Sequence, residues 1–255
     1  MNNQIKQVII DGIIYELDYP LATVKGCDKG IKVANIKHKV EDCIVADIGE
    51  NAFSECKDLE FVNIDILSRE ELNRFICLNF SIGMYAFNGC SKLREIVIPS
   101  YFTEFGRGAF RCCSSLSKVI YFGKAYIGDY CFAHCDSLTS VSVRNLPEGC
   151  FSHCKSLKKF IVEDGITEIE TDAFELCKSL EYFYIPKSVK RIGQTVFCND
   201  FSLKKVVFED PNNWVYCSAY HDRKVKVSFD NPEENAKQFM REDFDDGVIE
   251  YRKIK

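Results

Sequence analysis

Apolar residues recur along the chain in one fixed arrangement, which is anchored on a phenylalanine and appears seven times. An apolar residue lies five positions before each anchor, Leu always lies six positions after it, and further apolar residues lie nine and eleven positions after it. The third position after the anchor is Cys in six copies and Asp200 in the seventh. The anchors are Phe53, Phe87, Phe110, Phe132, Phe151, Phe174 and Phe197. A fixed repeat of this kind predicts a repeat architecture.

The spacing within each copy predicts a short helical turn followed by a short strand. The anchor Phe, the Cys and the Leu are three positions apart, which suits a 3₁₀-like turn. The last two apolar residues are two positions apart, so both face the same side of a strand. One such unit has an apolar face that only neighbouring units can cover, and stacking also pairs the strands into a ladder. We therefore expect an α/β repeat fold, a solenoid of seven units with one shared core.

All the length variation between copies lies in the connections between them. From the last strand residue of one copy to the first apolar residue of the next, the chain advances by 18, 7, 6, 3, 7 and 7 positions. Loops tolerate insertion and packed cores do not, so this segment is expected at the edge of the stack. The longest connection has Ser68 and Glu71 at capping-box spacing, which predicts a short inserted helix near residues 65–80. The shortest, at residues 145–149, should tighten the stack locally.

Both ends of the chain depart from the repeat and are expected to cover the open ends of the stack. Asp11 and Gly12 lie between two apolar runs and predict a β-hairpin. Pro232 suits the first turn of a helix. The expected organisation is an N-terminal β cap over residues 1–44, repeats over residues 45–210, and a mixed C-terminal cap over residues 211–255.

The repeated frame resembles a known family. It reads Ile-x4-Phe-x2-Cys-x2-Leu-x2-apolar-x-apolar and is followed by Pro99 and Pro186 in two copies. This frame is similar to the BspA-like leucine-rich repeat, also known as the Treponema pallidum type, over at least residues 44–210. The resemblance implies a curved leucine-rich-repeat solenoid, with roles in adhesion and protein binding at bacterial or protist surfaces.

Composition and charge narrow the classes of function. The formal net charge is −5, and no run of Lys and Arg predicts nucleic-acid binding. No apolar run reaches the roughly 20 residues that span a bilayer, so we expect no membrane span. The first residues lack the apolar core of a signal peptide. The sequence alone therefore predicts a cytoplasmic protein, or a surface or secreted one if a leader has been removed. We expect a monomer.

The cysteines are explained mainly by packing. Of the 14 cysteines, six occupy the inward position of the repeat, where a free thiol behaves as a small apolar side chain. Neighbouring strands lie about 4.8 Å apart, and this separation leaves disulfide bridging open on geometric grounds. Reduced thiols are favoured in a chain without a leader, so we predict no disulfides.

One pattern resembles a metal site, because zinc favours Cys and His ligands. Cysteine and histidine cluster in two consecutive copies, at Cys131, His134, Cys135, Cys150, His153 and Cys154. A metal-binding protein or an enzyme centred on these residues is therefore one alternative. Packing explains the four cysteines equally, since two lie at the core position and two replace a small Ala. No His-Glu-x-x-His motif or Gly-rich phosphate loop is present, and we expect a non-enzyme without metal or cofactor.

The candidate binding surface is the strand side that faces away from the core. Residues eight and ten positions after each anchor should face outward, yet many of them are apolar or aromatic. Contiguous exposed apolar patches mark interaction sites, and Tyr is enriched among hot spots. The preference of β-branched residues for strands explains part of the pattern without a partner. We predict a protein partner on this face, or alternatively a host or matrix protein bound by a surface adhesin. The predicted contact residues are Phe61, Val97, Ile120, Lys159, Ile161, Tyr182, Tyr184 and Val207.

Overall fold

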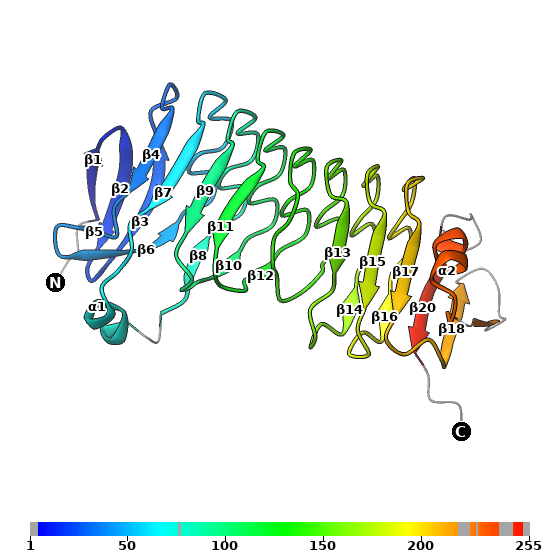
Figure 1. The fold of residues 1–255 in the computed structure, drawn as a ribbon. Helices are drawn as coiled ribbons and strands as arrows, with labels where there is room; N and C mark the ends of the chain where they lie inside the picture. The colour runs from blue at the N-terminus through cyan, green and yellow to red at the C-terminus, as the bar shows by residue number, and fades with distance from the viewer. Residues whose placement is uncertain (1–4, 76–77, 219–224, 228, 240–246, 252–255) are drawn as a thin grey trace.

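The protein is one elongated stack of turns (Figure 1). The computed structural model describes residues 5–75, 78–218, 225–227, 229–239 and 247–251. The N-terminal hairpins lie at one end of the stack, and helix α2 (Pro232–Phe239) lies at the other. In the described part of the chain, no helix is long and apolar enough to cross a membrane.

The turns of the stack form two parallel ladders, where the sequence predicts one. The face ladder holds one strand before the first anchor, β4 (Val33–Ile36), and the strands that follow six of the seven anchors: β7 (Phe61–Ile64), β9 (Glu95–Ile98), β11 (Lys118–Tyr121), β13 (Lys159–Ile161), β15 (Tyr182–Ile185) and β17 (Lys205–Phe208). The back ladder holds the strands with the apolar residue five positions before six of the seven anchors, β6 (Cys43–Ile48), β8 (Phe80–Ile82), β10 (Phe102–Phe105), β12 (Tyr126–Ile127), β14 (Glu168–Ile169) and β16 (Arg191–Ile192), while Leu146, before the fifth anchor, forms an isolated bridge to Ile169. The prediction overlooked the back ladder because each copy has a single apolar residue there.

The face ladder begins one turn before the first anchor Phe. Strand β4 pairs in parallel with β7, with Ala34 opposite Val62. Ala34 and Ile36 are fully buried, so β4 carries the apolar alternation of the repeat although no Phe, Cys or Leu frame precedes it. The predicted count of seven units is therefore not confirmed, because the ladder extends beyond the copies that the frame defines.

The turn at each anchor Phe is not helical, so the helical-turn character of the units is not confirmed. Within the described residues the two helices are α1 (Arg69–Arg74) and α2. In every copy, the residues two positions before and two positions after the anchor have positive φ, between 51° and 74°. A 3₁₀-helix requires negative φ throughout, so these two left-handed residues replace it with a tight irregular turn. The turns bond from unit to unit, as where Phe53 N donates to Ala86 O at 2.7 Å.

The anchor phenylalanines form a continuous stack through the core, as the repeat predicts. Successive rings are nearly parallel, with centroids 5.0 Å apart for Phe53 and Phe87, 5.2 Å for Phe110 and Phe132, and 5.6 Å for Phe132 and Phe151. The anchors, the six Cys and the seven Leu all belong to one buried cluster. Each buried Phe contributes about 2–3 kcal/mol through removal of its surface from water.

The repeated cysteine has a polar role in addition to its apolar one. The thiols of Cys90, Cys113 and Cys135 each donate to the carbonyl oxygen of the anchor Phe one unit earlier, over 3.1 Å. Cys154 and Cys177 repeat this contact at 3.3 and 3.2 Å. All cysteines in the described part of the chain carry free thiols. The position therefore favours a side chain that is small, apolar and able to donate.

The remaining elements cover the two ends of the stack. At the N-terminus, an antiparallel β1–β2–β3 sheet continues into the back ladder, with Asp11 and Gly12 forming the expected hairpin turn. At the C-terminus, β20 pairs antiparallel with β16, and the buried Asn235 of α2 donates to Val206 O at 2.9 Å. Other bounds are β1 (Lys6–Ile10), β2 (Ile13–Asp18), β3 (Leu21–Cys27), β5 (Lys39–Val40), β18 (Trp214–Ser218), β19 (Val225–Val227) and β20 (Gly247–Tyr251). The cap expected over residues 211–255 includes 219–224, 228, 240–246 and 252–255, which lie outside the described residues.

Candidate functional site

The predicted contact residues all lie on strands of the face ladder, on the side opposite the core. The alternation of exposure along the strands places them there: in β7, Phe61 and Asn63 are exposed while Val62 and Ile64 are buried. Phe61 and Ile161 are the most open apolar members, with exposed fractions of 41% and 53%. Val97, Ile120, Tyr182, Tyr184 and Val207 are half-buried, and Lys159 is exposed.

Strand register divides these residues into two neighbouring clusters. Toward the N-terminus, Val97 lies opposite Ile120 on the adjacent strand, and Phe61 begins the next strand of the same sheet. The second cluster lies toward the C-terminus: Lys159 lies opposite Tyr182, Ile161 opposite Tyr184, and Tyr184 opposite Val207. The sequence analysis missed Val33 of β4, which is 49% exposed and lies opposite Phe61. The alternation in residues 33–36 was the available signal for it.

Electrostatics on the C-terminal cluster centre on one lysine and two tyrosines. The ammonium of Lys159 lies 5.0 Å from the centroid of the Tyr182 ring, a cation–π geometry. Local desolvation and the negative charge of Glu209 raise the pKa of Tyr184. Its hydroxyl, protonated at neutral pH as in any tyrosine, can donate a hydrogen bond. Exposed ion pairs line the ladder, such as Lys204 with Glu181 at 2.8 Å, and pairs of this kind contribute about 1 kcal/mol or less.

The face ladder is interrupted at the fourth copy, where residues 139–143 form no strand. One four-stranded sheet ends at β11, and a separate three-stranded sheet starts at β13. The connection that follows is the shortest in the chain: Val143 bridges Ala125, and Leu146, three residues later, bridges Ile169 of the back ladder. Three residues span at most about 11 Å, so the chain must leave the face early to reach the back. The expected tightening is therefore wrong for this face, which opens instead.

A groove of about 440 Å³ lies at this break. One side consists of residues 139–143, and the other comes from β13 and the loop after it, with Lys159, Ile161, Glu163 and Ile166. Two predicted contact residues, Lys159 and Ile161, thus line a concave feature. Sequence reasoning did not assign residues 139–143 to it, although the short connection marked the place.

The metal alternative is not supported by the geometry. The rings of His134 and His153 stack with centroids 4.0 Å apart, and burial, followed by the neighbouring His153, lowers the pKa of His134. The thiols of Cys135 and Cys154 point into the core and donate to backbone carbonyls. Over the described ranges, no three His, Cys, Asp or Glu side chains gather to hold a metal ion.

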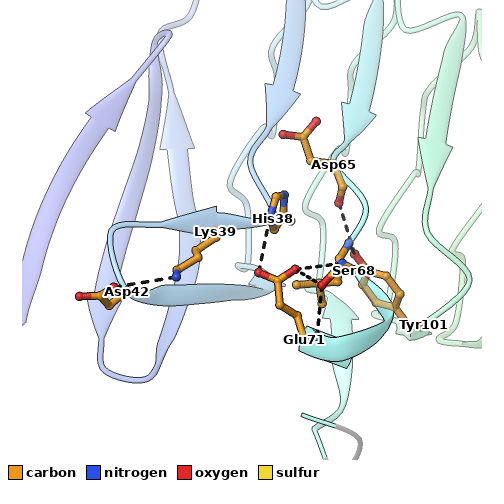
Figure 2. Close-up of polar contacts among 8 residues, drawn as sticks. His38, Lys39, Asp42, Asp65, Ser68, Glu71 and Tyr101 are labelled. Carbon is orange, nitrogen blue, oxygen red and sulfur yellow. Dashed lines mark hydrogen bonds and ion pairs between the residues drawn. The ribbon is translucent and has the colours of Figure 1, made fainter. Parts of the chain in front are cut away.

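The inserted helix α1 is fixed beside the β5–β6 hairpin by polar contacts (Figure 2). Ser68 and Glu71 form the expected capping box, in which Glu71 N donates to the Ser68 hydroxyl at 3.2 Å and Ser68 N donates to the Glu71 carboxylate at 2.9 Å. The same carboxylate lies 3.9 Å from His38 Nε2. The hydroxyl of Tyr101 donates to Asp65 O at 3.3 Å. These contacts account for the helix as a structural element.

Comparisons with known proteins agree with the repeat. The family profile described as the BspA type leucine rich repeat region matches in six copies, over residues 71–146 and 123–226. A leucine-rich-repeat protein of Treponema pallidum has a similar structure, with a TM-score of 0.62 and 22% identity, covering 78% of this chain and 91% of that one. A leucine-rich cell surface protein from Faecalibacterium prausnitzii has a TM-score of 0.60 and 20% identity, covering 91% of this chain and 63% of that one. A leucine-rich-repeat protein from Bacteroides ovatus has a TM-score of 0.50 and 24% identity, covering 80% and 71%. The search of curated proteins gave no match.

Proposed function

Because the chain belongs to the BspA-type leucine-rich-repeat family, we propose that it is a non-enzymatic module that binds a protein partner on the exposed side of the face ladder. A general role in protein interaction or at a surface fits this fold. The observation that carries the proposal is the set of outward apolar and aromatic side chains on the strands at both sides of the break, among them Phe61 and Ile161. Exposed apolar surface of this kind is costly to leave in water and marks interaction sites.

The centre of the proposed surface is the C-terminal cluster. Tyr182 and Tyr184 present rigid aromatic surface with hydrogen-bonding hydroxyls, the combination that is enriched at hot spots. Lys159 beside them adds a positive charge. The module acts as a monomer without a cofactor. Besides these three side chains, recognition uses Phe61, Val97, Ile120, Ile161 and Val207.

The test is affinity capture from native lysate by immobilised protein, analysed by mass spectrometry. The variant Tyr182→Ala/Tyr184→Ala should lose the partner that the wild type captures. A matched control is Tyr19→Ala/Tyr126→Ala, because these tyrosines are 72% and 58% exposed and lie away from the face ladder. If the face variant retains the partner as well as the control does, the strand face is the wrong surface.

A second candidate is a surface adhesin, which the name of the similar Faecalibacterium cell surface protein favours. In that case the partner is a host or matrix protein outside the cell. Fractionation of native cells, followed by protease treatment of intact cells, separates the two candidates: an adhesin is recovered with the cell surface and is digested, whereas an internal module is protected.

A further inference from the structure

The break in the face ladder leaves unpaired backbone groups on both sides of the groove. Along a strand in a sheet, the N–H and C=O of alternate residues point toward opposite neighbours. In β13, Val162 N donates to Tyr184 O at 3.0 Å and Lys158 O accepts from Tyr182 N at 3.3 Å. The even-numbered residues therefore face β15, and Lys159 and Ile161 direct their backbone groups to the groove.

Beyond residues 139–143, which form the opposite side of the groove, strand β11 also has a free edge. Lys118 N donates to Arg94 O at 3.2 Å, so the even-numbered residues of β11 face β9, and Val119 and Tyr121 direct their backbone groups away from it. Strand β11 ends its sheet. Between the two strands, the backbone of residues 139–142 has no backbone partner in the described part of the chain. A sheet edge of this kind is a template for an added strand.

The side chains of the groove define what kind of strand fits. Val141 is half-buried and Ile166 is buried, so the groove offers apolar contact to the side chains of an added strand that face inward. Its acidic residue Glu163 is already paired with Lys124 at 2.8 Å. Lys159 contacts the Tyr182 ring and has no ion-pair partner within the described residues. The uncompensated charge of the groove is therefore positive.

We propose that this groove binds an extended acidic peptide segment, which adds to the free edge of β13 and replaces the strand that the fourth copy lacks. Backbone hydrogen bonds to Lys159 and Ile161 supply affinity, as in other cases of strand addition. Alternate side chains of a strand face opposite sides, so the aliphatic side chains of the peptide face inward and pack on Val141, and its carboxylates face outward, where one pairs with Lys159. This inference rests on the proposed function and names the chemistry of the partner at one part of the face.

The experiment uses synthetic peptides as probes. A blocked, fluorescein-labelled peptide that alternates Val and Glu is titrated with the whole protein and followed by fluorescence anisotropy. Two matched peptides are compared with it: one with Lys in place of every Glu, and one N-methylated at alternate residues. Saturable binding of the Glu peptide is expected. The affinity of each control peptide should be lower by roughly tenfold or more, because each loses charge-assisted or backbone hydrogen bonds.

Protein variants locate the binding. Lys159→Glu should weaken binding of the Glu peptide roughly tenfold. Lys178→Glu should leave binding unchanged, because it makes the same charge change at an exposed lysine outside the groove. Ile161→Pro removes an N–H that faces the groove and spares the β13–β15 hydrogen bonds, as proline does on sheet edges. It should abolish binding without changing the midpoint of thermal unfolding.

Several outcomes would overturn the inference. They are the absence of saturable binding, equal binding of the Lys or N-methylated peptide, equal effects of Lys159→Glu and Lys178→Glu, or light scattering that shows a dimer blocking the groove. The capture experiment with Tyr182→Ala/Tyr184→Ala tests the broader proposal separately. Loss of capture without peptide binding rejects the groove alone, and peptide binding with unchanged capture rejects the tyrosine surface.

Discussion

The thiol of Cys135 donates a hydrogen bond to the carbonyl oxygen of Phe110, one unit earlier in the stack, over 3.1 Å. The same oxygen also accepts from Cys113 N at 3.2 Å, so the thiol fills its second acceptor position. Because the contact joins neighbouring units, it holds their register as well as filling the core. The preference for Cys over Ala or Val at this position follows from the donor.

Replacing this thiol separates its polar role from its apolar one. Cys135→Ala removes the donor and some buried volume, and should lower the free energy of unfolding by about 1–3 kcal/mol. Cys135→Ser keeps a donor and should cost less than Ala. Urea unfolding followed by circular dichroism measures both. A Ser variant that is less stable than the Ala variant would show that the hydrogen bond is unimportant.

The central anchor ring should be among the most costly side chains to remove. Phe132 is fully buried and stacks on Phe110 and Phe151, so Phe132→Ala should lower the free energy of unfolding by roughly 3–5 kcal/mol. Phe122→Ala is the matched control, because this ring is 92% exposed; its effect should stay within about 0.5 kcal/mol. Similar losses in the two variants would contradict the shared core.

The back ladder requires glycine where neighbouring backbones approach most closely. A Cβ at Gly128 would lie 2.5 Å from Arg107 N, which is backbone and cannot move aside cheaply. Gly128→Ala should therefore cost several kcal/mol and lower the thermal midpoint, as overpacking does. Gly30→Ala places its Cβ in open space and is expected to leave the midpoint nearly unchanged. Equal thermal midpoints for the two variants would mean that the strands of the back ladder can move apart at no cost in stability.

Asp200 makes the folding stability of the protein depend on pH. Burial raises the pKa of its carboxyl to about 8 from an ordinary 3.8. Between these values the folded chain holds a proton that the unfolded chain has lost, so stability falls as pH rises, by at most about 1.4 kcal/mol per pH unit. Below the ordinary pKa both states are protonated and the dependence ends.

The measurement compares urea midpoints of wild type, Asp200→Asn and Asp200→Cys at acidic and at mildly alkaline pH. Asp200→Cys restores the repeated residue and should be the most stable at alkaline pH. Both variants should lose the part of the pH slope that the carboxyl causes. A slope that persists unchanged in Asp200→Asn would assign it to other groups.

The buried positions could be predicted from the sequence because each one is repeated. Phe87, Cys90 and Leu93 occupy fixed offsets, and all three are fully buried. The turn geometry was less accessible, since the left-handed residues before the anchors include Tyr85 and Tyr130 as well as glycines. A non-glycine residue pays about 1–2 kcal/mol for that conformation, and here hydrogen bonds between units impose it. Residue preference alone does not reveal such a turn.

The outward positions of Phe61 and Tyr182 followed from strand alternation, but the groove did not. Its existence depends on the path between Val143 and Leu146, which decides whether residues 139–143 can stay in the ladder. The three-residue connection was visible in the sequence. Its consequence for the strands required the arrangement of both ladders in space.

The stacking of Phe110 on Phe132 and of Phe132 on Phe151 has a consequence for the history of such chains. Since each turn touches mainly the turns directly before and after it, a gene segment encoding one whole turn can be duplicated or excised while the junctions keep equivalent partners. Molecular length is therefore free to drift between relatives, and a single shortened linker is enough to give an otherwise uniform scaffold a distinctive groove.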